Sequence, residues 1–493
     1  MAGRPTEVER QIYQCAICIG GEWQFSRGRT ETLTNPATGE PSTQIPYCTG
    51  EEVQSAIQVA HTAFPSWRQC PTPQRARILF RYRHLLEEHR EELAALVTRE
   101  HGKTLEEARG SVQRGIEAVE FACGIPTLMM GESLENVGTG VDSVSIRQPL
   151  GVCLGIPPFN FPAMVPLWMF PLAIACGNTF IFKPSDKVPR TGVRLVELFH
   201  EAGLPAGVLN LVHGAKEVVD VLLDDPRVKA VSFVGSSPVA KYIYQTAAAK
   251  GKRVQALGGA KNHLVVMPDS DLKAAAKAIL ASAFGCAGER CLATSVVVAV
   301  GEAGAPLVRE LVQAADALKV GAGNHPDTAM GPVISAAHRE RILQYIEIGE
   351  REGAALVRDG RTVKSHDGSA GYYVGPTIFD RVRPEMRIAQ EEIFGPVLAV
   401  IQAKDLEEAI AIVNASRYGN ATAIFTRSGR AGREFASRIE AGMVGINVSV
   451  PAPSPYFPFA GWKGSFYGDL HAHGKDAIEF YTEKKVITSR WVS

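Results

Sequence analysis

Residues 230–237 read Ala-Val-Ser-Phe-Val-Gly-Ser-Ser, a β-rich apolar run that ends in small residues. Similar short apolar runs occur at 152–156, 179–183 and 208–213, and amphipathic helical stretches at 190–202 and 216–223 lie between them. Short strands that alternate with helices are typical of a parallel sheet with right-handed crossovers. The region 150–250 therefore predicts one parallel α/β domain.

The same alternation returns after about residue 258, which predicts a second α/β domain. Strands are expected at 264–267, 295–300, 397–402, 421–426 and 444–447, and helices at 271–283, 406–414 and 429–441. Before the first domain, residues 53–123 show mostly helical periodicity. Near the end, residues 477–488 alternate like a strand with no evident partner, and an unpaired edge of this kind favours pairing with another subunit.

The overall composition excludes several classes of protein. The chain has 493 residues, 45% hydrophobic and 21% charged, with 52 basic and 52 acidic side chains. A neutral chain offers no general attraction to nucleic acid or to an anionic membrane. Uninterrupted apolar runs of about 18 residues are absent, and residues 1–10 do not resemble a signal peptide. Nine scattered cysteines favour free thiols and a cytoplasmic location. The alternative for Cys15 and Cys18, which form a Cys-x-x-Cys, is a metal or redox motif.

A reactive cysteine is suggested by residues 283–291, Ala-Phe-Gly-Cys-Ala-Gly-Glu-Arg-Cys. Small residues leave a substrate room to reach the sulfur of Cys291. The neighbouring Arg290 is a cation, and a cation favours the thiolate, which is the nucleophilic form. The alternative is that Cys291 is an ordinary buried thiol, as most cysteines are.

Four polar motifs follow predicted strands, where open parallel sheets collect their ligands. Asn160 lies between prolines and aromatics and could donate to an oxyanion, Lys183 and Asp186 suit ribose hydroxyls, and Ser236 opens a helix that could accept a pyrophosphate. Glu392 and Phe394 precede another strand. Each motif taken singly also fits a turn or a solvated loop, and the GxGxxG fingerprint is absent.

Together these motifs resemble the NAD(P)-dependent aldehyde dehydrogenase superfamily, over nearly the whole chain. Residues 159–171 (Phe-Asn-Phe-Pro-Ala-Met-Val-Pro-Leu-Trp-Met-Phe-Pro), 259–263 (Gly-Ala-Lys-Asn-His) and 288–291 (Gly-Glu-Arg-Cys) are similar to the CoA-acylating branch that acts on methylmalonate semialdehyde. The resemblance implies Cys291 as nucleophile and Asn160 as oxyanion donor. It implies an NAD site made of Phe159, Lys183, Asp186, Lys187, Ser236, Glu392 and Phe394, with Asp186 favouring NAD over NADP.

One departure from the hydrolytic members concerns the final step. Where they carry a glutamate before Leu-Gly-Gly, this chain has Ala256. Water needs a positioned base, whereas a thiol is partly ionised near neutral pH and needs less help. The loss favours coenzyme A as acyl acceptor, although Glu289 remains an alternative base. A hydrolytic aldehyde dehydrogenase that yields a free acid is the second hypothesis, and a non-catalytic protein on this fold is the third.

Two arginines are expected to bind a substrate carboxylate, because the planar guanidinium suits a carboxylate. The resemblance implies Arg114 and Arg290. Arg109 lies on the same predicted helix as Arg114, but five residues turn it by roughly 140°. The alternative for Arg114 alone is a solvated surface charge.

The resemblance also implies a fold and a reaction. The expected fold is two parallel-sheet α/β domains, a Rossmann-type NAD-binding domain (1–126 and 148–257) and a catalytic domain (258–457), with a small β oligomerisation arm (127–147 and 458–493). The expected reaction is NAD-dependent, CoA-acylating, decarboxylating oxidation of methylmalonate or malonate semialdehyde to propionyl-CoA or acetyl-CoA. No metal, nucleic acid or membrane partner is expected. The chain is expected to form a homotetramer or a homodimer.

Overall fold

The computed structural model describes residues 12–491, and its first sheet has eight strands. Their order is β22 (Phe466–Gly468), β12 (Arg253–Leu257), β11 (Val228–Val234), β8 (Val152–Ile156), β9 (Thr179–Phe182), β10 (Leu209–Leu211), β2 (Ile17–Ile19) and β3 (Glu22–Gln24). The five strands from β12 to β10 run parallel. All four strands expected between 150 and 250 are present in this sheet, which confirms the predicted α/β domain.

Helices cover both faces of this sheet, so its central strands are buried on both sides. On β9, Phe180 and Phe182 pack into one core and Ile181 into the other, as alternation along a strand requires. The core on the Ile181 side also contains residues of α1 (Gly50–Gln69), α8 (Lys216–Asp224) and α9 (Ser237–Ala248). The core on the opposite side contains residues of α2 (Thr72–Glu88), α3 (Arg90–His101), α4 (Leu105–Cys123), α5 (Ile125–Leu128), α6 (Pro166–Ala175) and α7 (Pro189–Glu201).

Helix α4 begins at a capping box. The Thr104 hydroxyl accepts from the backbone N–H of Glu107, and the Glu107 carboxylate accepts from the backbone N–H of Thr104. Reciprocal bonds of this kind satisfy two of the free donors at a helix start. The sequence signal Thr-x-x-Glu thus fixes where α4 begins, and with it which face of the helix meets the rest of the molecule.

The second sheet has seven strands, in the order β15 (Ala355–Arg358), β16 (Thr377–Asp380), β17 (Val397–Ala403), β14 (Thr294–Val300), β13 (Asn262–Val266), β19 (Ala421–Phe425) and β20 (Met443–Ile446). All pairs are parallel except that of the edge strand β15. Its helices are α10 (Leu272–Phe284), α11 (Gly304–Asp316), α12 (Ala336–Arg351), α13 (Arg387–Gln390), α14 (Leu406–Asn414) and α15 (Gly429–Arg438). The predicted second parallel α/β sheet is confirmed, with β15, β16, α11, α12 and α13 in addition.

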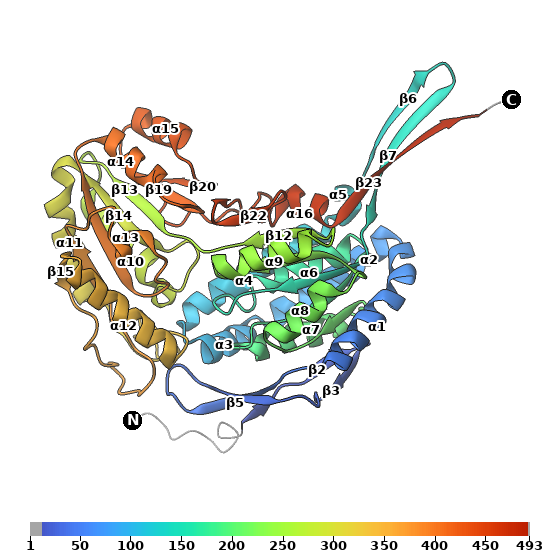
Figure 1. Cartoon of the computed structure of the whole chain (residues 1–493), viewed down its shortest axis with the longest axis horizontal. Coiled ribbons are helices and arrows are strands. Elements are labelled where there is room, and N and C mark those ends of the chain that lie inside the picture. Colours follow the sequence, from blue (N-terminus) through green and yellow to red (C-terminus); the bar gives the residue numbers. More distant parts are fainter. Residues whose placement is uncertain (1–11, 492–493) are drawn as a thin grey trace.

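A three-stranded antiparallel arm projects from the body (Figure 1). It is formed by β23 (Thr482–Arg490), β7 (Val141–Pro149) and β6 (Glu132–Gly138). The strand predicted at 477–488 with no evident partner was partly wrong. Its first part belongs to α16 (Gly474–Phe480), and the strand that follows, β23, pairs along its whole length with β7. Residues 458–493 also do more than form an arm, since β22 extends the first sheet.

Smaller elements complete the fold. Strands β1 (Tyr13–Gln14), β5 (Pro41–Pro46) and β4 (Thr30–Thr34) form one small sheet, and β18 (Tyr418–Gly419) pairs with β21 (Trp462–Lys463). The thiols of Cys15 and Cys18 are almost fully buried, and burial raises the pKa of both. Every helix in residues 12–491 is too short or too polar to span a bilayer.

Candidate active site

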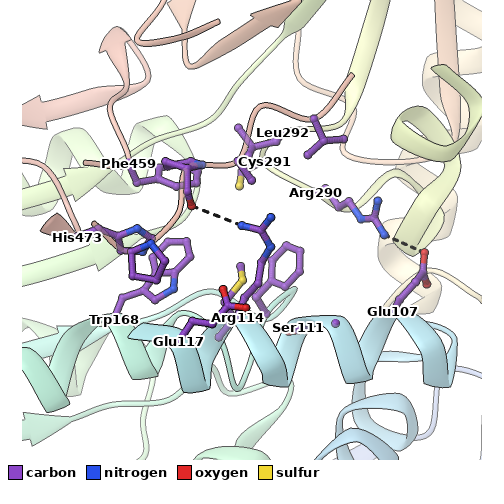
Figure 2. A pocket seen from close by; sticks show the side chains of 17 residues that line it. Glu107, Ser111, Arg114, Glu117, Trp168, Arg290, Cys291, Leu292, Phe459 and His473 are labelled. Carbon is purple, nitrogen blue, oxygen red and sulfur yellow. Dashed lines mark hydrogen bonds and ion pairs between the residues drawn. The ribbon is translucent and has the colours of Figure 1, made fainter. Parts of the chain in front are cut away.

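Two cavities meet at Cys291. The larger, which we call the cofactor cavity, has a volume of about 860 Å³, and the smaller, which we call the acyl cavity, has about 300 Å³. Cys291 lines both, and so do the aromatic rings of Phe161, Trp168 and Phe459. Figure 2 shows the acyl cavity between the sulfur and α4. Groups bound in the two cavities can therefore meet at one sulfur atom.

The loop that carries Cys291 has an unusual backbone. After α10 ends at Phe284, Cys286, Ala287 and Gly288 all have positive φ values, of 50°, 52° and 75°. A Cβ on Gly288 would lie 2.3 Å from the carbonyl oxygen of Gly395, so only glycine fits there. Left-handed conformations in non-glycine residues are costly and persist where the surroundings hold them. The loop is therefore rigidly built around its cysteine.

The nucleophile is anchored to the second sheet. The carbonyl oxygen of Cys291 accepts hydrogen bonds from the side-chain amides of Asn262, at 2.9 Å, and Asn420, at 2.8 Å. Asn262 begins β13 and Asn420 directly precedes β19, neighbouring strands of that sheet. Motion of the second sheet will therefore carry the sulfur with it.

The Cys291 thiol is not activated as expected from the sequence. Burial, with a further contribution from the Glu392 carboxylate, raises the pKa of Cys291 to about 12. Arg290 lowers this pKa only weakly, because its guanidinium points to Glu107 and away from the sulfur (Figure 2). Arg290 therefore acts in the expected direction, but burial outweighs it and keeps the pKa of the Cys291 thiol raised.

Asn160 is buried and held from two sides. The side-chain amide of Asn160 donates to the backbone carbonyl oxygen of Glu289 at 2.8 Å. The backbone carbonyl oxygen of Asn160 accepts from the Lys103 ammonium at 2.6 Å. A primary amide has two N–H groups, so one donor remains after the bond to Glu289. Asn160 lines the cofactor cavity beside Cys291, which suits an oxyanion donor.

All seven residues expected to bind NAD line the cofactor cavity. They are Phe159, Lys183, Asp186, Lys187, Ser236, Glu392 and Phe394. The Lys183 ammonium donates to the carbonyl oxygen of Gly214 at 2.7 Å, and burial lowers the pKa of Lys183. The Lys187 ammonium lies 4.9 Å from the ring centre of Phe159. Five of the residues belong to the first sheet's loops, and Glu392 and Phe394 come from the second domain.

The two arginines expected to bind a carboxylate both line the acyl cavity, in different states. Arg290 is paired with Glu107 at 3.0 Å, whereas the guanidinium of Arg114 makes one long hydrogen bond, 3.4 Å, to the carbonyl oxygen of Pro453. Arg109 instead pairs with Glu91 at 2.8 Å, away from the cavity. Arg114 is thus the arginine of α4 that faces Cys291 (Figure 2).

Comparison with known proteins gives the family. The sequence pattern of the aldehyde dehydrogenase family matches residues 23–487. This chain belongs to the aldehyde dehydrogenase family. Among curated relatives of this aldehyde dehydrogenase, malonate-semialdehyde dehydrogenase 2 of Geobacillus thermodenitrificans is 59% identical, over 96% of this chain and 98% of the relative. Malonate-semialdehyde dehydrogenase of Halalkalibacterium halodurans is 55% identical, over 96% and 97%.

Solved structures of other aldehyde dehydrogenases share the fold. The methylmalonate-semialdehyde dehydrogenase of Oceanimonas doudoroffii has a TM-score of 0.96 and 51% identity, covering 98% of this chain and 99% of that one. A protein of Sinorhizobium meliloti 1021, assigned to the same enzyme class and solved with NAD, has a TM-score of 0.97 and 47% identity over the same shares. The expected fold class is therefore confirmed.

The structure places the two residues that bear on deacylation, Ala256 and Glu289. Ala256 is fully buried on β12 and is not among the described residues that line either cavity. Glu289, the alternative base, is also fully buried. Its carboxylate lies 3.5 Å from the imidazoles of His101 and His338 and accepts from the backbone N–H of Ile334 at 3.1 Å. Neither residue is placed to activate a water molecule at the acyl group.

Several cavity residues of this aldehyde dehydrogenase were not predicted from the sequence. Glu107, Ser111 and Glu117 line the acyl cavity on the same face of α4 as Arg114, and His473 and Phe459 enter from the C-terminal segment. The capping signal at Thr104 could have identified Glu107. His473 has no local signal of this kind, because its position depends on a contact with Trp168, which is remote in sequence.

Proposed function

We propose that this aldehyde dehydrogenase oxidises malonate or methylmalonate semialdehyde in an NAD-dependent, CoA-acylating reaction that yields acetyl-CoA or propionyl-CoA. One observation carries the proposal: Cys291 stands between a cofactor cavity and an acyl cavity whose wall includes the guanidinium of Arg114, which is held by a long hydrogen bond to the Pro453 carbonyl. The relatives named for these semialdehydes, at 59% and 51% identity over nearly the whole chain, support the same substrates.

The first step is addition of Cys291 to the aldehyde carbonyl. The Cys291 thiol loses its proton to solvent water in the cavity, and the resulting thiolate forms the S–C bond. The electron pair of the C=O bond moves to the oxygen, which becomes an alkoxide. The free N–H of Asn160 and the backbone N–H of Cys291 are proposed to hold this alkoxide, which is electrostatic stabilisation of the charge that develops in the transition state. Arg114, together with Arg290, supplies positive charge for the substrate carboxylate in the acyl cavity.

The cofactor cavity fits NAD. Ser236 is the N-cap of α9 but makes no side-chain capping bond, so its hydroxyl is available to a pyrophosphate at this helix start. Lys183 and Asp186 would hold the adenine ribose, and Glu392 and Phe394 the nicotinamide end. A carboxylate at 186 would repel a 2′-phosphate, which favours NAD over NADP. NAD bound in this cavity would supply the acceptor for the hydride that leaves the former carbonyl carbon.

The acyl group then leaves Cys291 as a thioester of coenzyme A. Loss of the β-carboxylate as CO₂ is possible at the thioester stage, because the thioester carbonyl stabilises the resulting enolate, which then takes up a proton. The CoA thiolate attacks the carbonyl carbon and releases the Cys291 thiolate. The overall reaction consumes the semialdehyde, NAD and CoA and produces acyl-CoA, CO₂ and NADH. The buried positions of Ala256 and Glu289 support thiol rather than water as acceptor.

The domain roles are part of the proposal. Residues 1–126 and 148–257 are assigned to NAD binding, 258–457 to catalysis, and 127–147 with 458–493 to assembly. Strand β23 supports the last assignment, because it is an edge strand whose Val486 side chain is 68% exposed. An edge of this kind can pair with a second copy, so we propose a homodimer or homotetramer, working in the cytoplasm.

The test is NADH formation from each semialdehyde with and without CoA, with the acyl product identified by mass. Turnover that depends on CoA and ends in acetyl-CoA or propionyl-CoA is expected. Equal steady-state rates without CoA, ending in free acid, would establish the hydrolytic alternative. A protein that bound NAD but oxidised neither semialdehyde would remove the substrate assignment.

A further inference from the structure

We propose that Lys103 is a positioning residue for the oxyanion site: it fixes the backbone of Asn160, so that the free side-chain N–H of Asn160 points to the alkoxide formed at Cys291. The inference rests on the proposed addition of Cys291 to an aldehyde. It extends that addition to a residue that is not among the described residues lining either cavity. Lys103 therefore acts on the reaction through the residues that it holds.

Lys103 is fully buried and contacts the segment that carries Asn160. Its ammonium donates to the backbone carbonyl oxygen of Asn160 at 2.6 Å and lies 4.0 Å from the ring centre of Phe161. Asn160 lines the cofactor cavity, and Phe161 lines both cavities. Among residues 12–491, no carboxylate pairs with this ammonium. Both contacts of the Lys103 ammonium are therefore with the wall of the active site.

The burial of this charge calls for a reason. An ammonium without a counter-ion is costly to bury, because it loses its hydration and gains no ion pair. A hydrogen bond from a charged donor and the face of an aromatic ring offset part of this cost. The adjoining helices do not need the ammonium, since Gly102 ends α3 and Thr104 caps α4. What the ammonium stabilises is the position of residues 160 and 161.

The backbone of Lys103 is itself held firmly. Lys103 is the single residue between Gly102, which ends α3 with a φ of 93°, and Thr104, which caps α4. A Cβ on Gly323 would lie 2.2 Å from the backbone carbonyl oxygen of Lys103. The carbonyl oxygen of Gly323 also accepts from the backbone N–H of Leu105 at 2.9 Å. Two helix ends and a segment of the second domain thus fix the base of the Lys103 side chain.

The backbone of Asn160 has little other support. Asn160 belongs to residues 157–165, which lie between β8 and α6 and form neither helix nor strand. Among residues 12–491, the Lys103 ammonium is the one hydrogen-bond donor to the backbone carbonyl of Asn160. The Asn160 side chain is tied to Glu289, two residues before the nucleophile. Without the ammonium a buried carbonyl is left unpaired, so residue 160 should shift and carry its free N–H away from the alkoxide.

The experiment measures the rate constant of the NADH burst from malonate semialdehyde with NAD and without CoA, which reports addition and hydride transfer. In Lys103→Met this rate constant should fall about tenfold or more, because a misplaced oxyanion donor stabilises the transition state less. NAD affinity and the rate of Cys291 alkylation by iodoacetamide should stay within about threefold of the wild type, since alkylation forms no alkoxide. Lys252→Met is the matched control, because the Lys252 ammonium is also buried and donates to the backbone carbonyls of Asp225 and Val228.

A double-mutant cycle with Asn160→Ala tests whether Lys103 acts through Asn160. Asn160→Ala keeps the carbonyl that Lys103 binds and removes the amide, so adding Lys103→Met should change the burst rate constant by less than about threefold. An undiminished effect in this background would overturn the inference. So would an unchanged burst in Lys103→Met, or equal losses of burst and alkylation. If Lys103→Met does not fold, as judged by circular dichroism, Lys103→Gln carries the same test.

Butanal, a neutral aldehyde of similar length, separates the inference from the proposed function. Both aldehydes form an alkoxide at Cys291, so Lys103→Met should slow the burst from each by the same factor. A wild-type enzyme that oxidised butanal but neither semialdehyde would overturn the proposed substrates, and the burst from butanal would still decide the role of Lys103.

Discussion

The two cavities at Cys291 are built by different parts of the chain. The cofactor cavity is lined largely by loops that follow strands of the two sheets. The acyl cavity shares Phe161, Trp168 and Cys291 with it, and the rest of its wall comes mainly from one face of α4 and from segments between 450 and 473. Sheet topology therefore fixes where the cofactor residues lie, and a helix with a C-terminal segment decides which acyl group fits. Substrate choice can change on this fold without disturbing the cofactor site.

The largest effect is expected where the two cavities join. Cys291→Ala removes the sulfur that both cavities share, so NADH formation should fall about 10³-fold or more, because no covalent intermediate can form. NAD binding, measured by quenching of protein fluorescence, should stay within about threefold of the wild type. A large loss of NAD affinity would mean that the cavities do not act separately.

The protonation state of Cys291 gives the second prediction. With its pKa raised to about 12 by burial, the thiolate fraction should rise about tenfold for each pH unit from 7 to 10. The rate of Cys291 alkylation by iodoacetamide, followed by peptide mass, should therefore rise about 10³-fold over this range. A plateau near pH 8 would show that Arg290 activates the thiol after all.

A change confined to the cofactor cavity should leave substrate choice unaltered. Lys183→Met keeps the buried stem and removes the ammonium, so KM for NAD should rise about tenfold, the worth of a lost hydrogen bond from a charged group. The ratio of kcat/KM for malonate semialdehyde to that for butanal should stay constant. Lys229→Met, whose exposed ammonium bonds the carbonyl of Pro226, serves as the control. A changed aldehyde ratio in Lys183→Met would link the two sites.

The smallest effect concerns the buried layer beneath both cavities. Burial raises the pKa of the Glu289 carboxyl to about 8, while burial lowers the pKa of His101 and His338 and keeps both imidazoles neutral. Between about pH 4.5 and pH 8 the folded state holds a proton on Glu289 that the unfolded state releases, so stability falls as pH rises.

Glu289→Gln removes this dependence, because the amide does not ionise. The melting temperature of the variant relative to the wild type should therefore rise between pH 5 and pH 8, by several degrees. The comparison is best made by scanning fluorimetry at constant ionic strength. A constant difference across that range would mean that Glu289 is ionised in the folded protein throughout.

The sequence was most informative where one strand decides where a residue lies. Lys183, Asp186 and Ser236 each follow a strand, and their convergence on one cavity was predicted from that pattern. The lining of the acyl cavity was harder to predict from the sequence. Glu107 and Arg290 are 183 residues apart, and the position of His473 depends on packing against Trp168. The direction of Arg290 could not be predicted, because its partners lie on two different helices. The tail was partly misjudged because α16 and β23 both satisfy alternating apolar patterns.

The anchoring of Cys291 to Asn262 and Asn420 has a kinetic consequence. The Cys291 sulfur moves with the second domain and Arg114 moves with the first. The distance between the sulfur and the Arg114 guanidinium therefore depends on how the two domains are held together. NAD would bridge both domains and fix that distance, because Lys183 and Asp186 would hold one end of it and Glu392 and Phe394 the other. We therefore expect compulsory-order kinetics, in which the nucleotide enters first and the semialdehyde second.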